Sequence, residues 1–328
     1  MKVINSLESL KDSDPDRYSR CSFQLDAMSI RRQISYDAHT GRMFGFVDIG
    51  SGDDNSTEEA KEALVFMLVG IQGYWKIPIA YFLTNTLTAA AQKELVILTL
   101  QELEDRGFEV IAVTMDGHAS NMAMCQLLGC SLNVQDPRPY FTLPDSERQI
   151  FIIIDPCHVL KLFRNTFASY GDLYSDSGVV SWSHITELHA LQETSGLRAG
   201  NKLSSKHIGF HSQKMKVSLA AQTLSNSVAK ALRMAHEIGY QQFDGVLPTV
   251  ELLEVVDRLF DILNSRNPRA KGYKAPISHH NCHRVMEFLA TCRDKLLTLQ
   301  TMDLKFLHDT KRYQSDSLCI FSRLSCCY

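Results

Sequence analysis

The sequence lacks both a hydrophobic run that could span a membrane and a start that resembles a secretion signal. No stretch of its 328 residues reaches the roughly 18 consecutive apolar residues of a membrane helix. The first twenty residues are polar and acidic, whereas a signal peptide has a basic and then an apolar region. We therefore expect an intracellular protein with no membrane partner.

Paired cysteines, an excess of positive charge and two common catalytic signatures are also absent. The nine cysteines include no CxxC pair, which favours reduced thiols over a disulfide framework. The formal charge of −3 means that any nucleic-acid partner must be met by local basic patches. Neither a GxxxxGK[ST] phosphate loop nor a GxSxG serine-hydrolase elbow occurs. With 45% hydrophobic residues, the chain is typical of a soluble protein of about two domains.

The first half of the chain has a strand pattern that changes to an alternation of helix and strand. The pattern predicts three short strands in an antiparallel meander, at residues 22–30, 32–37 and 42–50. It also predicts a further strand region with an irregular connection at residues 62–84. The helical spacing in 88–106 stops at Gly107, and the apolar run FEVIAVTMDG predicts a strand covered on both faces. A helix, the strand RQIFIII and another helix follow.

This order of elements is that of the ribonuclease H fold. Beyond Tyr170 the strands disappear and long helical patterns take over, at residues 181–193, 216–239, 247–266 and 277–300. We therefore predict an α/β protein with a ribonuclease-H-like mixed-sheet domain over residues 1–170, followed by an all-α domain over residues 171–328.

Three aspartates stand where an apolar strand ends: Asp26, Asp116 and Asp155. Carboxylates on neighbouring strands can converge on Mg²⁺, and a pair of such ions supports in-line phosphoryl transfer. The alternative is that each aspartate caps a helix or a turn. Asp155 fits that alternative best because it precedes Pro156 and a helix. On that helix Lys161 and Arg164 either contact DNA phosphates or belong to a solvated surface.

Three long segments resemble the catalytic motifs of the P-element-type and THAP-domain DNA transposases. They are FQLDAMSIRRQISYDAHTGRMFGFVDIG, VTMDGHASNMAMCQLLGC and IFIIIDPCHVLKLFRN. Two segments of the helical half are similar to the same family: GNKLSSKHIGFHSQKMKVSLAAQTLS and LFDILNSR. The resemblance implies a metal-dependent transposase core that cuts and joins DNA, with a helical insertion that binds GTP. Asp26 and Asp116 would be its first two catalytic, metal-binding acids, and Asp155 would not be a principal ligand.

The resemblance also shows what this chain lacks. The family's third acid is a glutamate in a Q-D-x-L-E-x-F-F-like helix, whereas this chain runs HDTKRYQSDSLCIFSRLSCCY after residue 307. No Cys and His set of a zinc-binding THAP module precedes Asp26. We therefore expect a core fragment, truncated at both ends, that is inactive by itself. The alternatives are a catalytically inactive domesticated protein that still binds DNA or nucleotide, and a generic nucleotide-binding α/β protein.

The helical half contains a stretch without acids that could bind phosphate. No Asp or Glu lies between Glu193 and Glu237, where lysines and arginines accumulate, although a solvated basic face is the plain alternative. An aromatic ring suits a base, and a carboxylate can accept from the N1 and N2 edge of guanine. The same apolar residues at helical spacing could instead be core. By resemblance the GTP pocket comprises Lys202, Lys216, Val217, Ser225, Phe260, Asp261 and Asn264.

The resemblance further implies partners and a compartment. Mg²⁺ and GTP would be the cofactors, and DNA in the form of transposon ends would be the substrate. Such a protein acts in the nucleus, and either a homodimer or a higher oligomer is compatible with the sequence.

Overall fold

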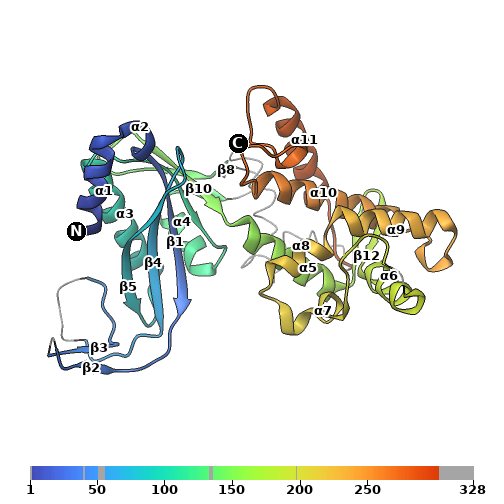
Figure 1. Ribbon diagram of the computed structural model, residues 1–328, viewed down its shortest axis with the longest axis horizontal. Coiled ribbons are helices and arrows are strands. Elements are labelled where there is room, and N and C mark those ends of the chain that lie inside the picture. The colour runs from blue at the N-terminus through green and yellow to red at the C-terminus, as the bar shows by residue number, and fades with distance from the viewer. Residues whose placement is uncertain (1, 40, 51–55, 133–135, 197, 303–328) are drawn as a thin grey trace. The chain divides into compact units, whose positions relative to one another are not determined.

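The structure, a computed structural model, describes residues 2–39, 41–50, 56–132, 136–196 and 198–302. These residues divide into two compact units, which we call the sheet unit (residues 2–131 and 136–153) and the helical unit (residues 154–302). Figure 1 shows the strands of the first unit and the helices of the second. Within the described ranges no helix is both long and apolar enough to cross a bilayer.

The sheet unit is built on a six-stranded mixed sheet in the order β5-β4-β1-β6-β10-β9. Strand β1 pairs antiparallel with β4 and parallel with β6, while β4 pairs antiparallel with β5. This arrangement confirms the expected ribonuclease-H-like mixed sheet. The strands are β1 (Arg20–Ser29), β4 (Glu62–Gly70), β5 (Lys76–Thr84), β6 (Glu109–Met115), β9 (Tyr140–Thr142) and β10 (Gln149–Ile154).

An aromatic row ties the first strands of this sheet together. The ring of Phe66 lies 4.9 Å from that of Phe23 and 5.0 Å from that of Phe82, measured between centroids, and both contacts are edge-on. Phe23 and Phe66 are completely buried. Edge-on aromatic pairs add to the stability gained from burial, so this row fixes β1, the strand that carries Asp26.

Helices complete the sheet unit. The helix α3 buries Val96, Leu100 and Leu103, and it ends before Gly107, which has a positive φ of 76°. The sequence pattern correctly predicted α3 and α4, whereas the first helix was missed because its residues are mostly polar. The helices are α1 (Lys2–Ser13), α2 (Pro15–Tyr18), α3 (Ala89–Asp105) and α4 (Ala119–Leu127).

The expected three-stranded meander is wrong. Only its first strand is a strand of the main sheet: β2 (Ser35–Asp37) and β3 (Arg42–Phe44) pair with each other, and the described residues after β3 make a single bridge to that sheet, from Asp48 to Leu83 of β5. Both β2 and β3 are three residues long and largely exposed, so they bury too little apolar surface to hold a place in the sheet. The buried run 62–70 takes that place. A second short pair comprises β7 (Ser131–Leu132) and β8 (Pro137–Arg138).

The helical unit buries a second core around α5, α6 and α10. Trp182 packs edge-on against Phe167 at 5.4 Å and against Phe210 at 6.2 Å, measured between ring centroids. The unit also contains a hairpin of β11 (Asp172–Ser175) and β12 (Gly178–Ser181), so the expectation of an exclusively helical second half is wrong in this detail. Its helices are α5 (Pro156–Tyr170), α6 (Trp182–Ser195), α7 (Ser205–Ile208), α8 (Val217–Thr223), α9 (Asn226–Ile238), α10 (Leu247–Leu263) and α11 (Cys282–Leu297), with single 3-10 turns at 210–213, 241–243 and 272–274.

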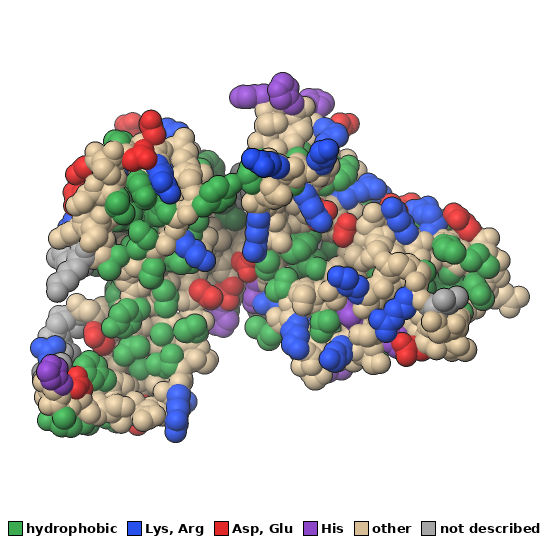
Figure 2. Space-filling view, viewed as in Figure 1, with side chains coloured by type: hydrophobic (Ala, Val, Ile, Leu, Met, Phe, Trp, Pro, Cys, Tyr) green, Lys and Arg blue, Asp and Glu red, His purple; other side chains and the backbone are tan. Residues whose placement is uncertain are grey.

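The two units differ in the surfaces that they show. On the face in Figure 2, hydrophobic side chains gather over the sheet unit, while Lys and Arg side chains are spread over the helical unit. The acid-free stretch of the helical unit has five exposed lysines: Lys202, Lys206, Lys214, Lys216 and Lys230. Not all of this charge is unbalanced, because Arg233 lies 2.9 Å from Glu254.

Candidate metal centre and nucleotide pocket

Asp26 and Asp116 lie at the same level of two adjacent parallel strands. The last paired residues of β1 and β6 are Gln24 and Thr114, and each aspartate follows two residues later. Side chains alternate along a strand, so Asp26 shares a face of β1 with Gln24. Asp26 is exposed, in contrast to its neighbour Leu25, which is 3% exposed. The fold therefore brings these two acids to one end of the sheet.

A chain of neutral hydrogen bonds holds the carboxylate of Asp116. Gln92 on α3 donates to Oδ1 of Asn121 at 2.5 Å, and the amide of Asn121 donates to Oδ1 of Asp116 at 2.6 Å. The backbone N–H of His118 donates to the same oxygen at 3.0 Å. None of these donors is charged, so they orient the carboxylate without neutralising it. A fixed carboxylate that keeps its charge is suited to a cation.

A cavity of about 150 Å³ lies beside Asp116 and is also lined by His118, Asn121 and Glu62. Sequence reasoning missed Glu62, which is the first residue of β4 and pairs with Ser29 of β1. Asp26 pairs with Val65, three residues further along β4, so Glu62 and Asp26 point to opposite faces of the sheet. Among the described residues no group of three or more His, Cys, Asp or Glu side chains is arranged to hold a metal ion.

Asp155 caps a helix, as the sequence suggested. Its Oδ1 accepts from the backbone N–H of Cys157 at 2.9 Å, and its Oδ2 accepts from that of His158 at 3.2 Å. These bonds satisfy the first amides of α5, whose first residue is Pro156. The structure thus gives this aspartate a complete structural role.

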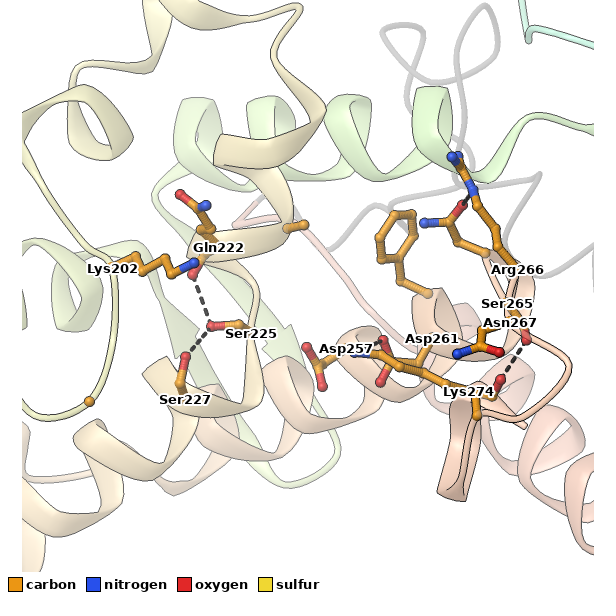
Figure 3. Close-up of a pocket in the computed structure, with 15 residues that line it drawn as sticks. Lys202, Gln222, Ser225, Ser227, Asp257, Asp261, Ser265, Arg266, Asn267 and Lys274 are labelled. Carbon is orange, nitrogen blue, oxygen red and sulfur yellow. Dashed lines mark hydrogen bonds and ion pairs between the residues drawn. The ribbon is translucent and has the colours of Figure 1, made fainter. Parts of the chain in front are cut away.

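The helical unit contains a cavity of about 550 Å³, shown in Figure 3. Its α10 wall carries Asp257, Phe260, Asp261 and Asn264, whose spacing of three and four residues places them on one face of the helix. Five of the seven residues expected in the GTP pocket line it: Lys202, Ser225, Phe260, Asp261 and Asn264. Phe260 is partly exposed toward the cavity and is not a core residue.

A break between two helices forms another wall. The sequence pattern predicted one helix over 216–239, but α8 ends at Thr223 and α9 begins at Asn226. Ser225 stands between them, where its Oγ donates to the backbone oxygen of Gln222 at 2.9 Å and accepts from the backbone N–H of Val228 at 3.4 Å. The hydroxyls of Ser225 and Ser227 are 2.8 Å apart. Figure 3 shows Lys202, Gln222, Ser225 and Ser227 together at one side of the cavity.

The other side of the cavity is acidic but partly balanced. Nζ of Lys274 lies 3.3 Å from Oδ1 of Asp261. Burial, and then the neighbouring charge of Asp261, raises the pKa of Asp257, while a backbone hydrogen bond from Asn226 opposes that rise. One side of the cavity therefore offers the amine of Lys202 with hydroxyls, and the other offers carboxylates together with Lys274 and Arg266. The hydroxyl side fits a phosphate, and the carboxylates fit hydrogen-bond donors of a ligand.

Lys216 and Val217 do not line this cavity. They form the start of α8, one turn before the lining residues Ala221 and Gln222. The segment just before them is held by α5, because Nη2 of Arg164 donates to the backbone oxygen of Gln213 at 3.1 Å. Arg164 is fully buried and its guanidinium lies over the ring of Phe210. Both interpretations of Arg164 as a surface residue are therefore wrong.

Several cavity residues were missed by sequence reasoning. Asp257 could have been found because it stands four residues before Asp261 on a predicted helix. Gln222, Arg266 and Lys274 carry no such signal, since they reach the cavity from a helix end and a loop. The lining is completed by Gly200, Ala221, Ser227, Ser265, Asn267 and Ala270.

The fold and the two candidate sites define a class: a ribonuclease-H-like sheet unit followed by a helical unit that contains a large polar cavity. Family models match both parts, "TNP-like, RNase H N-terminal domain" over residues 1–129 and "TNP-like, GTP-binding insertion domain" over residues 157–276. The chain belongs to the family of these TNP-like domains, which confirms the resemblance to P-element-type transposases inferred from the sequence.

Individual relatives agree with this assignment. The chain is 31% identical over 300 residues to the human protein "DNA transposase THAP9", covering 90% of this chain and 33% of that protein. It is 25% identical over 266 residues to "Transposable element P transposase" of Drosophila melanogaster, covering 80% of this chain and 32% of that protein. The chain thus spans about a third of the length of these relatives. A solved "Drosophila P element transposase strand transfer complex" has the same fold, with a TM-score of 0.78, 21% identity and coverage of 98% of this chain and 67% of that chain.

Proposed function

We propose that this chain provides two of the metal-binding acids of a transposase, Asp26 and Asp116, which act in the complete protein to cleave and join DNA. The observation that carries the proposal is their equal level on the parallel pair of β1 and β6. Carboxylates at that position suit Mg²⁺, which takes oxygen ligands and stabilises both the attacking and the leaving oxygen of a phosphodiester exchange.

Two carboxylates hold a metal pair less firmly than three. Residues 308–328, which do not contain the motif of the family's third acid, lie outside the described residues. We expect the 328-residue polypeptide alone to neither excise nor join DNA, because disruption of a metal pair costs several orders of magnitude in rate. Mg²⁺-dependent strand cleavage by the purified chain that disappears in Asp116→Ala would contradict this expectation, and would also argue against an inactive domesticated relative.

The metal assignment has its own test, which does not depend on catalysis. Mn²⁺ replaces Mg²⁺ at oxygen sites and enhances the relaxation of water protons, so its binding can be titrated. We expect Asp26→Ala and Asp116→Ala each to weaken Mn²⁺ binding by about tenfold or more. Asp105→Ala removes an exposed carboxylate at the end of α3 and serves as the matched control. Equal Mn²⁺ binding by all three variants would refute the site.

The proposal includes GTP as a cofactor in the cavity of the helical unit. Lys202 and Ser225 would face the phosphates, whereas Lys216 and Val217, at the start of α8, lie outside the lining of this cavity and are left out of the proposed contacts. Phe260 would stack on the base, Asp261 would accept from the N1 and N2 donors of guanine, and Asn264 would complete that end. The support is the convergence of five of these residues on one cavity.

Calorimetry tests the nucleotide assignment. We expect the chain to bind GTP in preference to ATP, and we expect Asp261→Ala to abolish that preference. Asp244→Ala, an exposed acid in the loop before α10, serves as the control for the loss of one negative charge. Equal affinity for the two nucleotides in the unaltered chain, or an unchanged preference in Asp261→Ala, would refute the guanine assignment.

The same proposal covers the wider organisation. Residues 1–170 would form the catalytic part and residues 171–328 the GTP-binding insertion. Transposon-end DNA would be the substrate, the nucleus the place of action, and a homodimer or higher oligomer the working form. The similarity to two DNA transposases and to a chain of a strand transfer complex supports the DNA partner.

A further inference from the structure

Gln222 is a cavity-lining residue whose side chain is held from behind by a buried histidine. Oε1 of Gln222 lies 3.0 Å from Nε2 of His207, which is only 3% exposed. The backbone oxygen of Gln222 also accepts from Oγ of Ser225. Both the main chain and the side chain of Gln222 are therefore fixed at the end of α8.

The hydrogen bonds of His207 determine which end of the Gln222 amide faces the cavity. The backbone N–H of Ser204 lies 3.0 Å from Nδ1 of His207 and can only donate, so Nδ1 is the acceptor. With Nδ1 as the acceptor, the ring N–H is on Nε2, which donates to Oε1 of Gln222. The amide nitrogen of Gln222 is thereby left as a donor, and among the described residues no acceptor reaches it.

We infer that Gln222 is a further nucleotide-binding residue whose Nε2–H donates to a phosphate oxygen, and that His207 positions it. This inference rests on the proposed GTP site. Figure 3 shows Gln222 at the side of the cavity that carries Lys202 and Ser225, away from Asp257 and Asp261. A neutral donor beside a lysine and hydroxyls suits a phosphate, whereas the acidic side suits the donors of a base.

The test compares GTP with guanosine, which has the same base and ribose but no phosphate. Gln222→Glu keeps an acceptor for His207 but replaces the donor with a negative charge. We expect this variant of the full chain to bind GTP about 10- to 100-fold more weakly and to bind guanosine unchanged. Gln242→Glu, an exposed site before α10, makes the same charge change and should leave both affinities unaltered.

Melting curves recorded without nucleotide establish that each variant is folded. If Gln222→Glu does not fold, Gln222→Met removes the donor without adding charge, and the same loss confined to GTP is expected. For His207, a double-mutant cycle separates positioning from general support. His207→Ala should weaken GTP binding in the unaltered chain and have no further effect in the Gln222→Met background.

Three results would overturn the inference: unchanged GTP affinity in both Gln222 variants, an equal loss for GTP and guanosine, or an additive loss in the His207 cycle. Each of these is distinct from failure of the proposed function, because in that case the unaltered chain would not bind GTP or would bind it without dependence on Asp261.

Discussion

The carboxylates of the two units have opposite electrostatic surroundings. In the sheet unit, Asp116 accepts hydrogen bonds from the amide of Asn121 and the backbone of His118, and neither donor carries charge. In the helical unit, Asp261 faces the ammonium of Lys274 and has the acid Asp257 one turn away. The first carboxylate is oriented and keeps its negative charge, whereas the second is already paired with a cation.

This difference indicates what each site is prepared to bind. A carboxylate held only by neutral donors is stabilised most by binding a cation, because its hydrogen-bond donors carry no positive charge. A carboxylate paired with a lysine can exchange that partner for the donors of a ligand, at a small cost because the lysine side chain is 63% exposed. Each of four substitutions would break or sharpen this contrast.

The largest effect is expected for Arg164→Ala in the helical unit. The substitution removes a fully buried side chain that packs on Phe210 and bonds to the backbone of Gln213, and we expect it to cost about 3 kcal/mol of unfolding free energy. The chain has two tryptophans, Trp75 in the sheet unit and Trp182 in the helical unit, so unfolding can be followed by fluorescence in single-tryptophan backgrounds.

In this experiment only the Trp182 transition should move to lower denaturant. Arg269→Ala, which truncates an exposed arginine, is the matched control. An equal shift of the Trp75 transition would show that the two units do not unfold separately.

Asn121→Leu should have a somewhat smaller effect, in the sheet unit. It leaves the buried amide of Gln92 without its acceptor and Asp116 without its side-chain donor, which we expect to cost about 1–3 kcal/mol. Mn²⁺ affinity should also fall by about tenfold or more, because the carboxylate loses its orientation. Denaturation followed at Trp75 and Mn²⁺ relaxation measure the two losses. Gln126→Leu on the same helix is exposed and should change neither. Unaltered Mn²⁺ binding would mean that orientation of Asp116 is not required.

Lys274→Ala tests the balanced carboxylate. Since the exposed ion pair with Asp261 must open before a base can bind there, its removal should raise GTP affinity by up to about fivefold, measured by calorimetry. Lys271→Ala, in the same loop and also exposed, is the control. A loss of about tenfold in affinity would instead identify Lys274 as a direct nucleotide contact.

Asp257→Asn should give the smallest effect, and one that depends on pH. Burial and Asp261 raise the pKa of Asp257, so the folded state holds this proton more tightly than the unfolded state. Folding stability therefore falls as the pH rises from the ordinary aspartate pKa to the raised one, and that loss persists above it. Asparagine removes the loss and still accepts from the backbone of Asn226.

The Trp182 melting temperature should thus be higher in Asp257→Asn at about pH 7, and the advantage should shrink below about pH 4. Asp244→Asn, at an exposed acid, should show no such change. If Asp257→Asn raised the melting temperature equally at both pH values, the increase would come from packing and not from the titration of Asp257.

Long apolar patterns gave a reliable prediction of the fold. The runs that became β6 and β10, and the helices α3, α5 and α10, were predicted from periodicity because burial on one or both faces requires it. The pair β2 and β3 shows where this fails. Its alternating residues are the same whether a strand joins a sheet or stands in a separate ribbon, and the choice depends on which segment can bury more surface.

For the candidate sites, the family motifs made Asp26, Asp116 and three α10 residues (Phe260, Asp261 and Asn264) accessible from the sequence, and their roles as metal and GTP ligands stay predictions. Glu62, Gln222 and Asp257 were missed although they lie on regular elements, because no motif singles them out. The break at Ser225 was not predicted, because a serine inside a helical pattern is equally compatible with a helix interior and a cap. That break places Gln222 and Ser227 at the cavity.

The sequence by itself therefore determined the strand and helix order, the family, and the two aspartates that follow β1 and β6, since each of these depends on local pattern or on motif. Only the tertiary structure decided what surrounds each carboxylate. Asp116 accepts from the neutral amide of Asn121 on α4, which is itself held by Gln92 of α3, and Asp261 faces a lysine 13 residues away in sequence. Charge balance at a site is a sum over groups that are distant along the chain, and such a sum exists only once the chain is folded.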